Sequence, residues 1–307
     1  MNADRLDLTS LRLFVAVVDA GSLTEAARTS ALSLPAVSKR IRELEALVGV
    51  QLLHRSRSGV VPSPAGSTLY QHALQVGADL AQLSLAMGDY RGNIKGHVRV
   101  CANTSAVTGF LPGFLSDYLR ARPQVKVDLE EVNSEPLVRA VESGKADLGI
   151  FAANVSCGTL QTAVCDVDSL VLVVPRGHPL QRRKRITWAD ALKYDFVGFN
   201  RGSAFMRLMD AESARLALPL KLRVQVKSFD AMCQMVACGI GLGLLSHQSA
   251  RILSRALPLS LLPLDEPWAR ERALLVGWRG DVVLGPHARL FLDQLRERGQ
   301  AHVRASS

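Results

Sequence analysis

We predict an α+β protein of several domains: an N-terminal winged helix-turn-helix, a long linker helix, and a C-terminal α/β part with two lobes. Three observations lead to this prediction. Residues 1–65 show short helix signals followed by a hairpin, residues 66–95 one long helix and a linker, and residues 96–307 strands that alternate with helices. A chain of 307 residues has room for two or three domains.

Composition excludes several other classes of protein. Apolar residues make up 48% of the chain and charged residues 21%, which is typical of folded rather than disordered proteins. No stretch approaches about 18 consecutive apolar residues, and residues 1–7 lack the apolar region of a signal peptide. We therefore expect a cytoplasmic protein with no membrane partner.

Cysteine spacing argues against a metal centre. The five cysteines include no C-x-x-C pair, so we expect reduced, buried thiols and no metal or cofactor. A redox pair, either Cys157 with Cys165 or Cys233 with Cys238, is the alternative.

Charge does not locate a partner by itself. The net charge of +9 favours nucleic acid, but residues 1–65 hold 8 basic and 6 acidic residues, whereas residues 96–307 hold 27 and 20. A DNA-binding surface must therefore be found from the local spacing of basic residues rather than from the net charge.

Two helices open the chain. Residues 8–20 carry apolar residues at helical spacing, and Gly21 ends that helix. Ser22 and Glu25 match the capping-box pattern at the start of a short helix over 23–29.

The third helix is predicted over 34–48, with Ser33 as N-cap and Gly49 as C-cap. Its apolar face carries Val37, Ile41, Leu44 and Val48. Its opposite flank carries Pro35, Lys39, Arg42 and Ala46, with Ser38 at the edge. Such a flank suits the major groove of DNA, because small residues allow close approach and cations meet phosphates or guanines. An ordinary surface helix with solvated charges is the alternative.

A hairpin is predicted next, with strands over 51–54 and 60–61 and a basic tip over 55–59. Arg55 and Arg57 would reach the DNA backbone or the minor groove. A basic helix followed by such a hairpin favours a winged helix-turn-helix.

A long helix is then predicted from Pro64, with Ser63 as N-cap, to about Asp89. An apolar stripe runs along it through Leu69, Ala73, Val76, Leu80, Leu83 and Met87. We interpret it as a dimerisation helix; packing against its own domain is the alternative.

The remainder is predicted to form two lobes with parallel sheets, lobe I over about 96–167 and 270–307 and lobe II over about 168–269. Strands are predicted at 97–101, 125–132, 147–151, 170–175, 196–199, 222–226, 241–245, 259–264 and 273–278, and helices at 105–120, 136–143, 204–216, 230–238 and 287–298. The candidate crossover strands are 166–169 and 265–271. The cleft between the lobes is the expected ligand site.

Several blocks of the sequence are similar to one known family. Residues 22–27 (SLTEAA), 33–45 (SLPAVSKRIRELE), 49–55 (GVQLLHR) and 64–66 (PAG) resemble the DNA-binding segment of LysR-type transcriptional regulators. Residues 98–100, 110–112, 144–150, 175–180 and 236–243 resemble the rest of that family in outline.

The resemblance implies a regulator rather than an enzyme. It implies a periplasmic-binding-protein-like effector domain, homodimers usually paired into tetramers, and double-stranded DNA sites of two-fold symmetry. A small molecule in the cleft would change transcription, with RNA polymerase as a further partner.

Carried over by position, the resemblance implies a set of DNA-facing residues. These are Ser33, Leu34, Pro35, Ser38, Lys39 and Arg42 on the third helix, with Arg55 and Arg57 on the wing. Many family members have glutamine at the position of Leu34. A leucine cannot hydrogen-bond to a base, although it can touch a thymine methyl group.

Effector residues are expected where strands end and helices begin. They are Asn103, Thr104, Ser105, Arg201, Gly202, Ser203, Ser228 and Phe229. Two helix N-termini and Arg201 would favour a carboxylate. Plain helix capping by Ser105 and Ser203 is the alternative.

Other functions find less support in the sequence. It contains no Walker motif, no H-E-x-x-H and no G-x-S-x-G, so an enzyme is disfavoured. A solute-binding protein of a transport system is the rival, which the absent signal peptide and residues 8–66 oppose. The basic run 182–185 is interpreted as a solvated loop, with a second DNA contact as the alternative.

Overall fold

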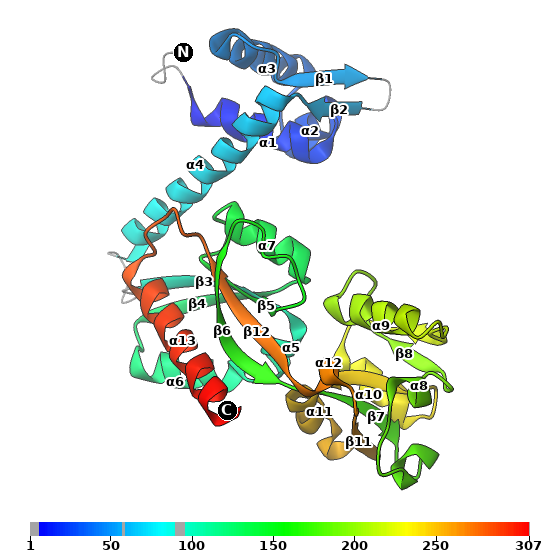
Figure 1. The fold of residues 1–307 in the computed structure, drawn as a ribbon. Helices are drawn as coiled ribbons and strands as arrows, with labels where there is room; N and C mark the ends of the chain where they lie inside the picture. The colour runs from blue at the N-terminus through cyan, green and yellow to red at the C-terminus, as the bar shows by residue number, and fades with distance from the viewer. Residues whose placement is uncertain (1–5, 57–58, 90–95, 307) are drawn as a thin grey trace. The chain divides into compact units, whose positions relative to one another are not determined.

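A computed structural model describes residues 6–56, 59–89 and 96–306 (Figure 1). The chain divides into two compact units, with the boundary between Gly88 and Asp89. Within the described part of the chain, no helix is both long enough and apolar enough to cross a membrane.

The N-terminal unit contains three short helices, a hairpin and most of a long helix. The elements are α1 (Leu8–Ala20), α2 (Leu23–Thr29), α3 (Leu34–Val48), β1 (Leu53–Ser56), β2 (Gly59–Pro62) and α4 (Pro64–Asp89). Their apolar faces enclose one core that includes Phe14, Val37, Ile41 and Leu52. The predicted bounds of α1, α2 and α3 are confirmed.

Local hydrogen bonds explain these helix starts. The side chains of Ser22 and Ser33 accept from the backbone N–H groups of Glu25 and Ala36, each at 3.4 Å. Only half of the predicted capping box forms, because the Glu25 carboxylate pairs instead with Arg28 at 2.6 Å. Gly21 and Gly49 end α1 and α3 with φ of 59° and 76°, in the left-handed region.

Lobe I of the C-terminal unit is built on a five-stranded sheet in the order β4-β3-β5-β12-β6. The strands are β3 (Gly96–Ala102), β4 (Val125–Glu131), β5 (Leu148–Ala152), β6 (Gln161–Asp168) and β12 (Arg272–Trp278). The helices of this lobe are α5 (Thr104–Thr108), α6 (Leu111–Ala121), α7 (Ser134–Glu142) and α13 (Pro286–Ser306). Its core includes Phe151, Leu137 and Phe291.

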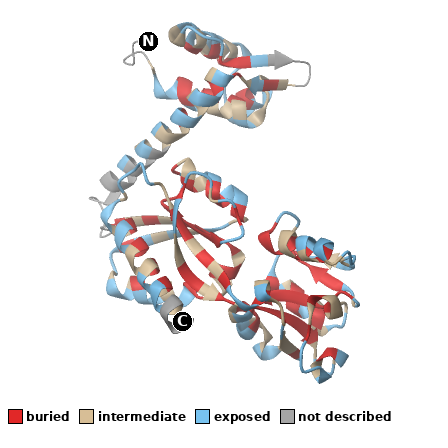
Figure 2. Ribbon diagram, viewed as in Figure 1, coloured by how far each residue is buried: buried red, intermediate tan, exposed pale blue. Residues whose placement is uncertain are grey.

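Lobe II holds a three-stranded sheet in the order β10-β7-β11 and the strand pair β8-β9. The strands are β7 (Leu170–Pro175), β8 (Phe196–Gly198), β9 (Leu222–Gln225), β10 (Gly243–Ser246) and β11 (Leu259–Pro263). The helices are α8 (Trp188–Ala191), α9 (Ala204–Arg215), α10 (Phe229–Ala237), α11 (His247–Leu253) and α12 (Pro267–Arg270), with short 3₁₀ turns η2 (Pro179–Arg182) and η3 (Ser254–Ala256). Trp188, Phe196 and Phe229 are central to its core. Figure 2 shows a separate buried interior in each lobe.

The prediction of parallel sheets is wrong for both large sheets: the sheet of lobe I is mixed, and the three-stranded sheet of lobe II is antiparallel. β3 runs parallel to β4 and β5, but β12 is antiparallel to both β5 and β6, and β7 is antiparallel to β10 and β11. The chain leaves lobe I along β6 and returns along β12, so these neighbouring strands must point in opposite directions.

Several predicted elements differ in detail, and two of them differ in kind. The helix expected over 105–120 is two helices, α5 and α6, which separate at Gly109. A Cβ at Gly109 would lie 2.6 Å from the carbonyl oxygen of Ser105, so a side chain does not fit there. The crossover expected as a strand over 265–271 contains the helix α12, which Pro267 starts.

Candidate functional site

One flank of α3 faces solvent in the N-terminal unit. Val37, Ile41 and Leu44 are buried on the opposite face. Ser33, Leu34, Pro35, Lys39 and Arg42 are exposed, and Ser38 is half-buried. The helix therefore presents the predicted small and basic residues outward, and Leu34 adds an exposed apolar side chain.

The two cations on this flank are only lightly restrained. The Lys39 ammonium lies 3.8 Å from the Glu43 carboxylate, and the Lys39 side chain is 72% exposed. The Arg42 guanidinium donates to the carbonyl oxygen of Ser38 at 3.2 Å. Exposed pairs of this kind contribute little stability, so both cations can turn to an external anion at small cost.

Glu45 joins α3 to the hairpin, a role that sequence reasoning missed. Its carboxylate accepts from the backbone N–H groups of Leu52 at 2.9 Å and Leu53 at 3.2 Å. The hairpin is tighter than predicted, because Arg55 lies within β1, opposite Val60, rather than in the tip. Arg57 lies outside the described residues.

The apolar stripe of α4 is divided between two environments. Leu69 packs against the core of the N-terminal unit, and Ala73 is buried. Farther along, Leu80 is half-buried, Val76 is 38% exposed and Leu83 is 56% exposed. The side chain of Met87 lies outside the described residues. The first turns thus serve the domain's own core, and later turns leave apolar surface open.

A narrow cavity lies between the lobes of the C-terminal unit, where β3, β4 and β8 end. Its volume is about 20 Å³. The lining residues are Asn103, Thr104, Ser105, Val132, Asn133, Ser134, Phe199, Ser203, Ala204, Phe205 and Arg272. That volume holds about one water molecule.

The predicted effector residues fall into two groups. Asn103, Thr104, Ser105 and Ser203 line the cavity. Arg201, Gly202, Ser228 and Phe229 are not among its lining residues. The first three of these are exposed, whereas Phe229 is buried with its ring 4.8 Å from that of Phe199 and 5.4 Å from that of Phe205.

Helix capping uses part of this polar lining. The Asn103 side chain accepts from Ala106 N–H at 3.0 Å, and the Ser203 hydroxyl accepts from Met206 N–H at 3.2 Å. The Thr104 hydroxyl donates to the Glu131 carboxylate at 2.6 Å.

Arg272 is a lining residue that sequence reasoning missed. It is the first residue of β12 and only 8% exposed. Its guanidinium donates to the Ser105 hydroxyl at 3.3 Å and lies 4.7 Å from the centroid of the Phe205 ring. Burial lowers the pKa of Arg272 to about 10, while the charge of Asp168 acts in the opposite direction, so the side chain stays charged at neutral pH.

Three polar contacts join the lobes around this cavity. The Arg207 guanidinium of α9 lies 3.2 Å from the Glu135 carboxylate of α7. The hydroxyls of Thr108 and Ser249 are 2.6 Å apart. The Gln248 side-chain amide donates to the Asp166 carboxylate at 3.0 Å.

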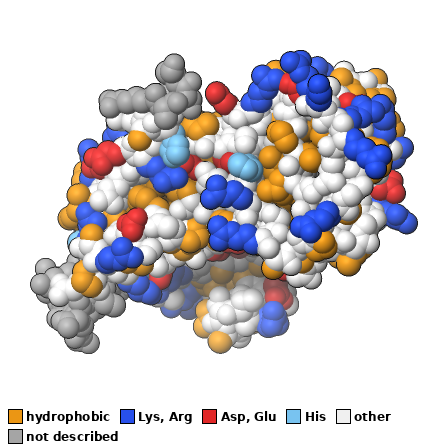
Figure 3. Space-filling view, turned by 90° about the horizontal axis from the view of Figure 1, so that it is seen from below, with side chains coloured by type: hydrophobic (Ala, Val, Ile, Leu, Met, Phe, Trp, Pro, Cys, Tyr) orange, Lys and Arg blue, Asp and Glu red, His pale blue; other side chains and the backbone are white. Residues whose placement is uncertain are grey.

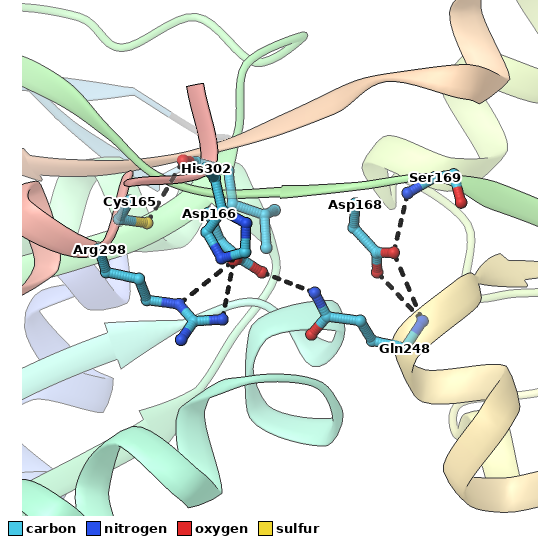
Figure 4. A network of polar contacts seen from close by, with 8 residues as sticks. Cys165, Asp166, Asp168, Ser169, Gln248, Arg298 and His302 are labelled. Atoms are coloured by element: carbon cyan, nitrogen blue, oxygen red, sulfur yellow. Dashed lines mark hydrogen bonds and ion pairs between the residues drawn. The ribbon is translucent and has the colours of Figure 1, made fainter. Parts of the chain in front are cut away.

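A buried network fixes the point where β6 leaves lobe I (Figure 4). The Asp166 carboxylate is fully buried and contacts Arg298 at 2.9 Å and His302 at 3.0 Å, both from α13. Two residues farther along, the Asp168 carboxylate accepts from Ser169 N–H at 2.8 Å and Gln248 N–H at 3.3 Å. Burial raises the pKa of Asp168.

The cysteines form no disulfide among the described residues. All five cysteines are free, and burial raises the pKa of Cys101 and of Cys233 to about 11. No group of three His, Cys, Asp or Glu side chains in the described ranges is placed to hold a metal ion.

Positive charge is concentrated in lobe II. Residues 168–269 hold 14 basic and 8 acidic residues. Figure 3 shows one face of the molecule, with lobe II on the right as in Figure 1. Blue Lys and Arg side chains outnumber red Asp and Glu side chains on that side. The basic run 182–185 is partly neutralised, because Arg183 pairs with Asp190 at 2.6 Å and Arg185 lies 3.8 Å from Asp265.

Comparison with known proteins identifies the family. Residues 8–67 match the bacterial regulatory helix-turn-helix protein, lysR family, and residues 91–300 match the LysR substrate binding domain. The RuBisCO operon transcriptional regulator of Allochromatium vinosum is 27% identical over 300 residues, which cover 97% of this chain and 99% of that protein.

Two solved structures have a similar fold. CbnR, a LysR family transcriptional regulator, has a TM-score of 0.66 and 18% identity, with 96% of this chain and 99% of CbnR covered. The effector binding domain of QuiR in complex with shikimate has a TM-score of 0.60 and 18% identity, with 67% of this chain and 98% of that domain covered. This chain is therefore a member of the LysR family of transcriptional regulators, with a helix-turn-helix domain followed by a substrate-binding domain.

Proposed function

We propose that the protein binds specific DNA sequences through the outward flank of α3 and that a small anionic molecule between the lobes controls this activity. The observation that carries the proposal is the exposed flank of Ser33, Leu34, Pro35, Ser38, Lys39 and Arg42 above a buried apolar face. Small residues such as Pro35 let the helix approach base edges closely, and Leu34 can touch a thymine methyl group. Lys39 and Arg42 contact guanines or phosphates. Arg55 and Arg57 of the wing would contact the backbone.

Assembly completes the proposal. Leu69, Ala73, Val76, Leu80, Leu83 and Met87 would form the dimerisation stripe, and pairs of dimers would give a tetramer. A dimer matches DNA sites of two-fold symmetry. We place this activity in the cytoplasm, with RNA polymerase as the further protein partner.

An anionic effector is supported by the chemistry of the cleft. The cavity combines the buried cation of Arg272 with polar side chains at the starts of α5, α7 and α9, and helix N-termini favour negative charge. The similarly folded QuiR domain binds shikimate.

Gel-shift titration on the duplex upstream of the protein's own gene tests the DNA-binding surface. Lys39→Ala is expected to weaken binding by about 1–3 kcal/mol, roughly 5- to 150-fold, if Lys39 reads a base. Lys193→Ala is the matched control, because Lys193 is also exposed in a pair with a nearby carboxylate, at 3.0 Å from Asp190, but lies in lobe II. Equal affinities for both variants would contradict the proposed surface.

The rival function, a pure solute-binding protein, predicts a different result. Filter binding of wild-type protein to duplex DNA would then show only weak retention, unaffected by Lys39→Ala. Retention that depends on Lys39 and falls steeply with salt supports the regulator.

A further inference from the structure

Arg272 is a buried cation with no carboxylate within ion-pair distance among the residues that the structure describes, although the charge of Asp168 acts on it. It forms no ion pair, and its one hydrogen bond goes to the neutral Ser105 hydroxyl at 3.3 Å. Two other arginines of lobe I contrast with it: Arg99 lies 2.6 Å from the Asp147 carboxylate, and Arg298 lies 2.9 Å from Asp166. Burying an arginine that forms no ion pair costs stability. Stability therefore does not explain why an arginine occupies this position.

The acidic side chain whose charge acts on Arg272 already accepts other hydrogen bonds. Asp168 lies opposite Arg272 in the β6–β12 register. Its carboxylate accepts backbone N–H groups from Ser169 and Gln248 and forms no ion pair with Arg272. Asp168 therefore helps to keep Arg272 charged without saturating the donors of its guanidinium.

Unused hydrogen-bonding groups face the same cavity. Within the described residues, the side chains of Asn133 and Ser134 line it and make no hydrogen bond. Phe199 and Phe205 supply apolar walls, and Phe205 covers the Arg272 guanidinium at 4.7 Å. The lining contains one cation, so it matches a ligand with one negative charge better than a doubly charged phosphate.

We propose that Arg272 binds the carboxylate of the effector, a compact hydroxy-monocarboxylate, and that this carboxylate replaces the Phe205 ring as the partner of the guanidinium. The inference rests on the proposed effector-controlled function. The carboxylate and guanidinium form two parallel hydrogen bonds, while ligand hydroxyls bond to Asn133 and Ser134.

The exchange couples binding to lobe movement. Phe205 belongs to α9 of lobe II, whereas Arg272 starts a strand of lobe I. A cavity of about 20 Å³ does not admit such a ligand while Phe205 covers Arg272. Entry therefore requires the lobes to separate or Phe205 to turn away, which changes the contact between them.

A test on the ligand-free protein separates a binding residue from a structural one. Arg272→Met is expected to leave the thermal midpoint unchanged or to raise it, because it removes a buried charge that forms no ion pair. Arg99→Met is the matched control and is expected to lower the midpoint, because it removes the ion pair between the Arg99 guanidinium and the Asp147 carboxylate. A midpoint for Arg272→Met that falls as far as that of Arg99→Met would overturn the proposal.

A thermal-shift titration then tests the ligand class. The probes are hydroxy-monocarboxylates of about three to seven carbons and the uncharged amides of the same skeletons. We expect at least one carboxylate, and not its amide, to stabilise the wild type. Arg272→Met should weaken that effect at least tenfold, and Arg176→Met, at an exposed arginine outside the cavity lining, should not.

The other outcomes are decisive as well. Stabilisation by none of the carboxylates, stabilisation only by the amides, or full retention of carboxylate binding in Arg272→Met overturns the proposal. Gel shifts of the same variants without added carboxylate report on DNA binding separately. A wild type that binds the carboxylate but no DNA would contradict the regulatory function and leave the Arg272 assignment standing.

Discussion

Glu45 shows how one side chain determines the geometry of a DNA-binding unit. It leaves α3 on the side of the hairpin and accepts the backbone N–H groups of Leu52 and Leu53. The recognition helix and the wing are thereby held as one body. A carboxylate in the middle of a helix gives no sequence signal for such a role, because its partners are set by the tertiary fold.

Removing this acceptor is expected to loosen the hairpin. In Glu45→Ala, the N–H groups of Leu52 and Leu53 lose their partner at a cost of about 1–3 kcal/mol, so their hydrogen exchange should be roughly tenfold to hundredfold faster. Glu45→Gln keeps one acceptor oxygen and should show a smaller effect. Unchanged exchange at both amides in Glu45→Ala would contradict the assigned contact.

The buried carboxylate of Asp168, where β6 leaves lobe I, makes the stability of the protein depend on pH. Burial raises the pKa of Asp168 in the folded state, so keeping this carboxylate ionised at neutral pH lowers the free energy of unfolding. The loss disappears below the ordinary aspartate pKa, because the group is then protonated in both the folded and the unfolded state. We expect Asp168→Asn to raise the thermal midpoint at pH 7 and to have little effect at pH 4. A loss at pH 7, or a larger gain at pH 4, would show that the carboxylate is stabilised in the fold.

Whole elements were predictable where their signals are local. The capping side chains of Asp7, Ser22 and Ser33 start α1, α2 and α3, left-handed glycines end α1 and α3, and the predicted bounds of the three helices match the structure. β6 was expected only at its C-terminal end, because its pairing with β12 joins segments about a hundred residues apart. The break between α5 and α6 depends on a close approach at Gly109 that no helical periodicity reveals.

The exposed part of α4 makes a prediction about assembly. Leu83 is 56% exposed, so Leu83→Glu should weaken self-association without unfolding the N-terminal unit. Light scattering at micromolar concentration is expected to show a dimer or larger species for the wild type and a shift towards monomer for Leu83→Glu. Leu290→Glu, at a 44% exposed leucine of α13, is the control and should not dissociate the assembly. A monomeric wild type would contradict the dimerisation helix.

At the scale of the whole molecule, the fold class was predictable, and the residues that line the cavity between the lobes only in part. Strand–helix alternation indicated two lobes, and the polar loops after β3 and before α9 were recognised. Arg272 could not be recognised from the sequence, because it starts a strand and reaches the cavity only when β12 returns from lobe II to lie beside β6. The exposed Arg201 was the local candidate, but the fold brings the distant arginine to the cavity instead.

The central claim is that the cations of the α3 flank contact DNA. Its most direct test is the dependence of duplex affinity on salt concentration for the wild type, Lys39→Ala, Arg42→Ala and the control Lys193→Ala. Each phosphate contact releases about one counterion, so removing Lys39 or Arg42 should reduce the slope of log K against log salt by about 1 if that residue contacts a phosphate. A contact to a base should instead lower affinity for the specific duplex more than for a scrambled one. Slopes and sequence preference identical to those of the wild type in both α3 variants would contradict the account.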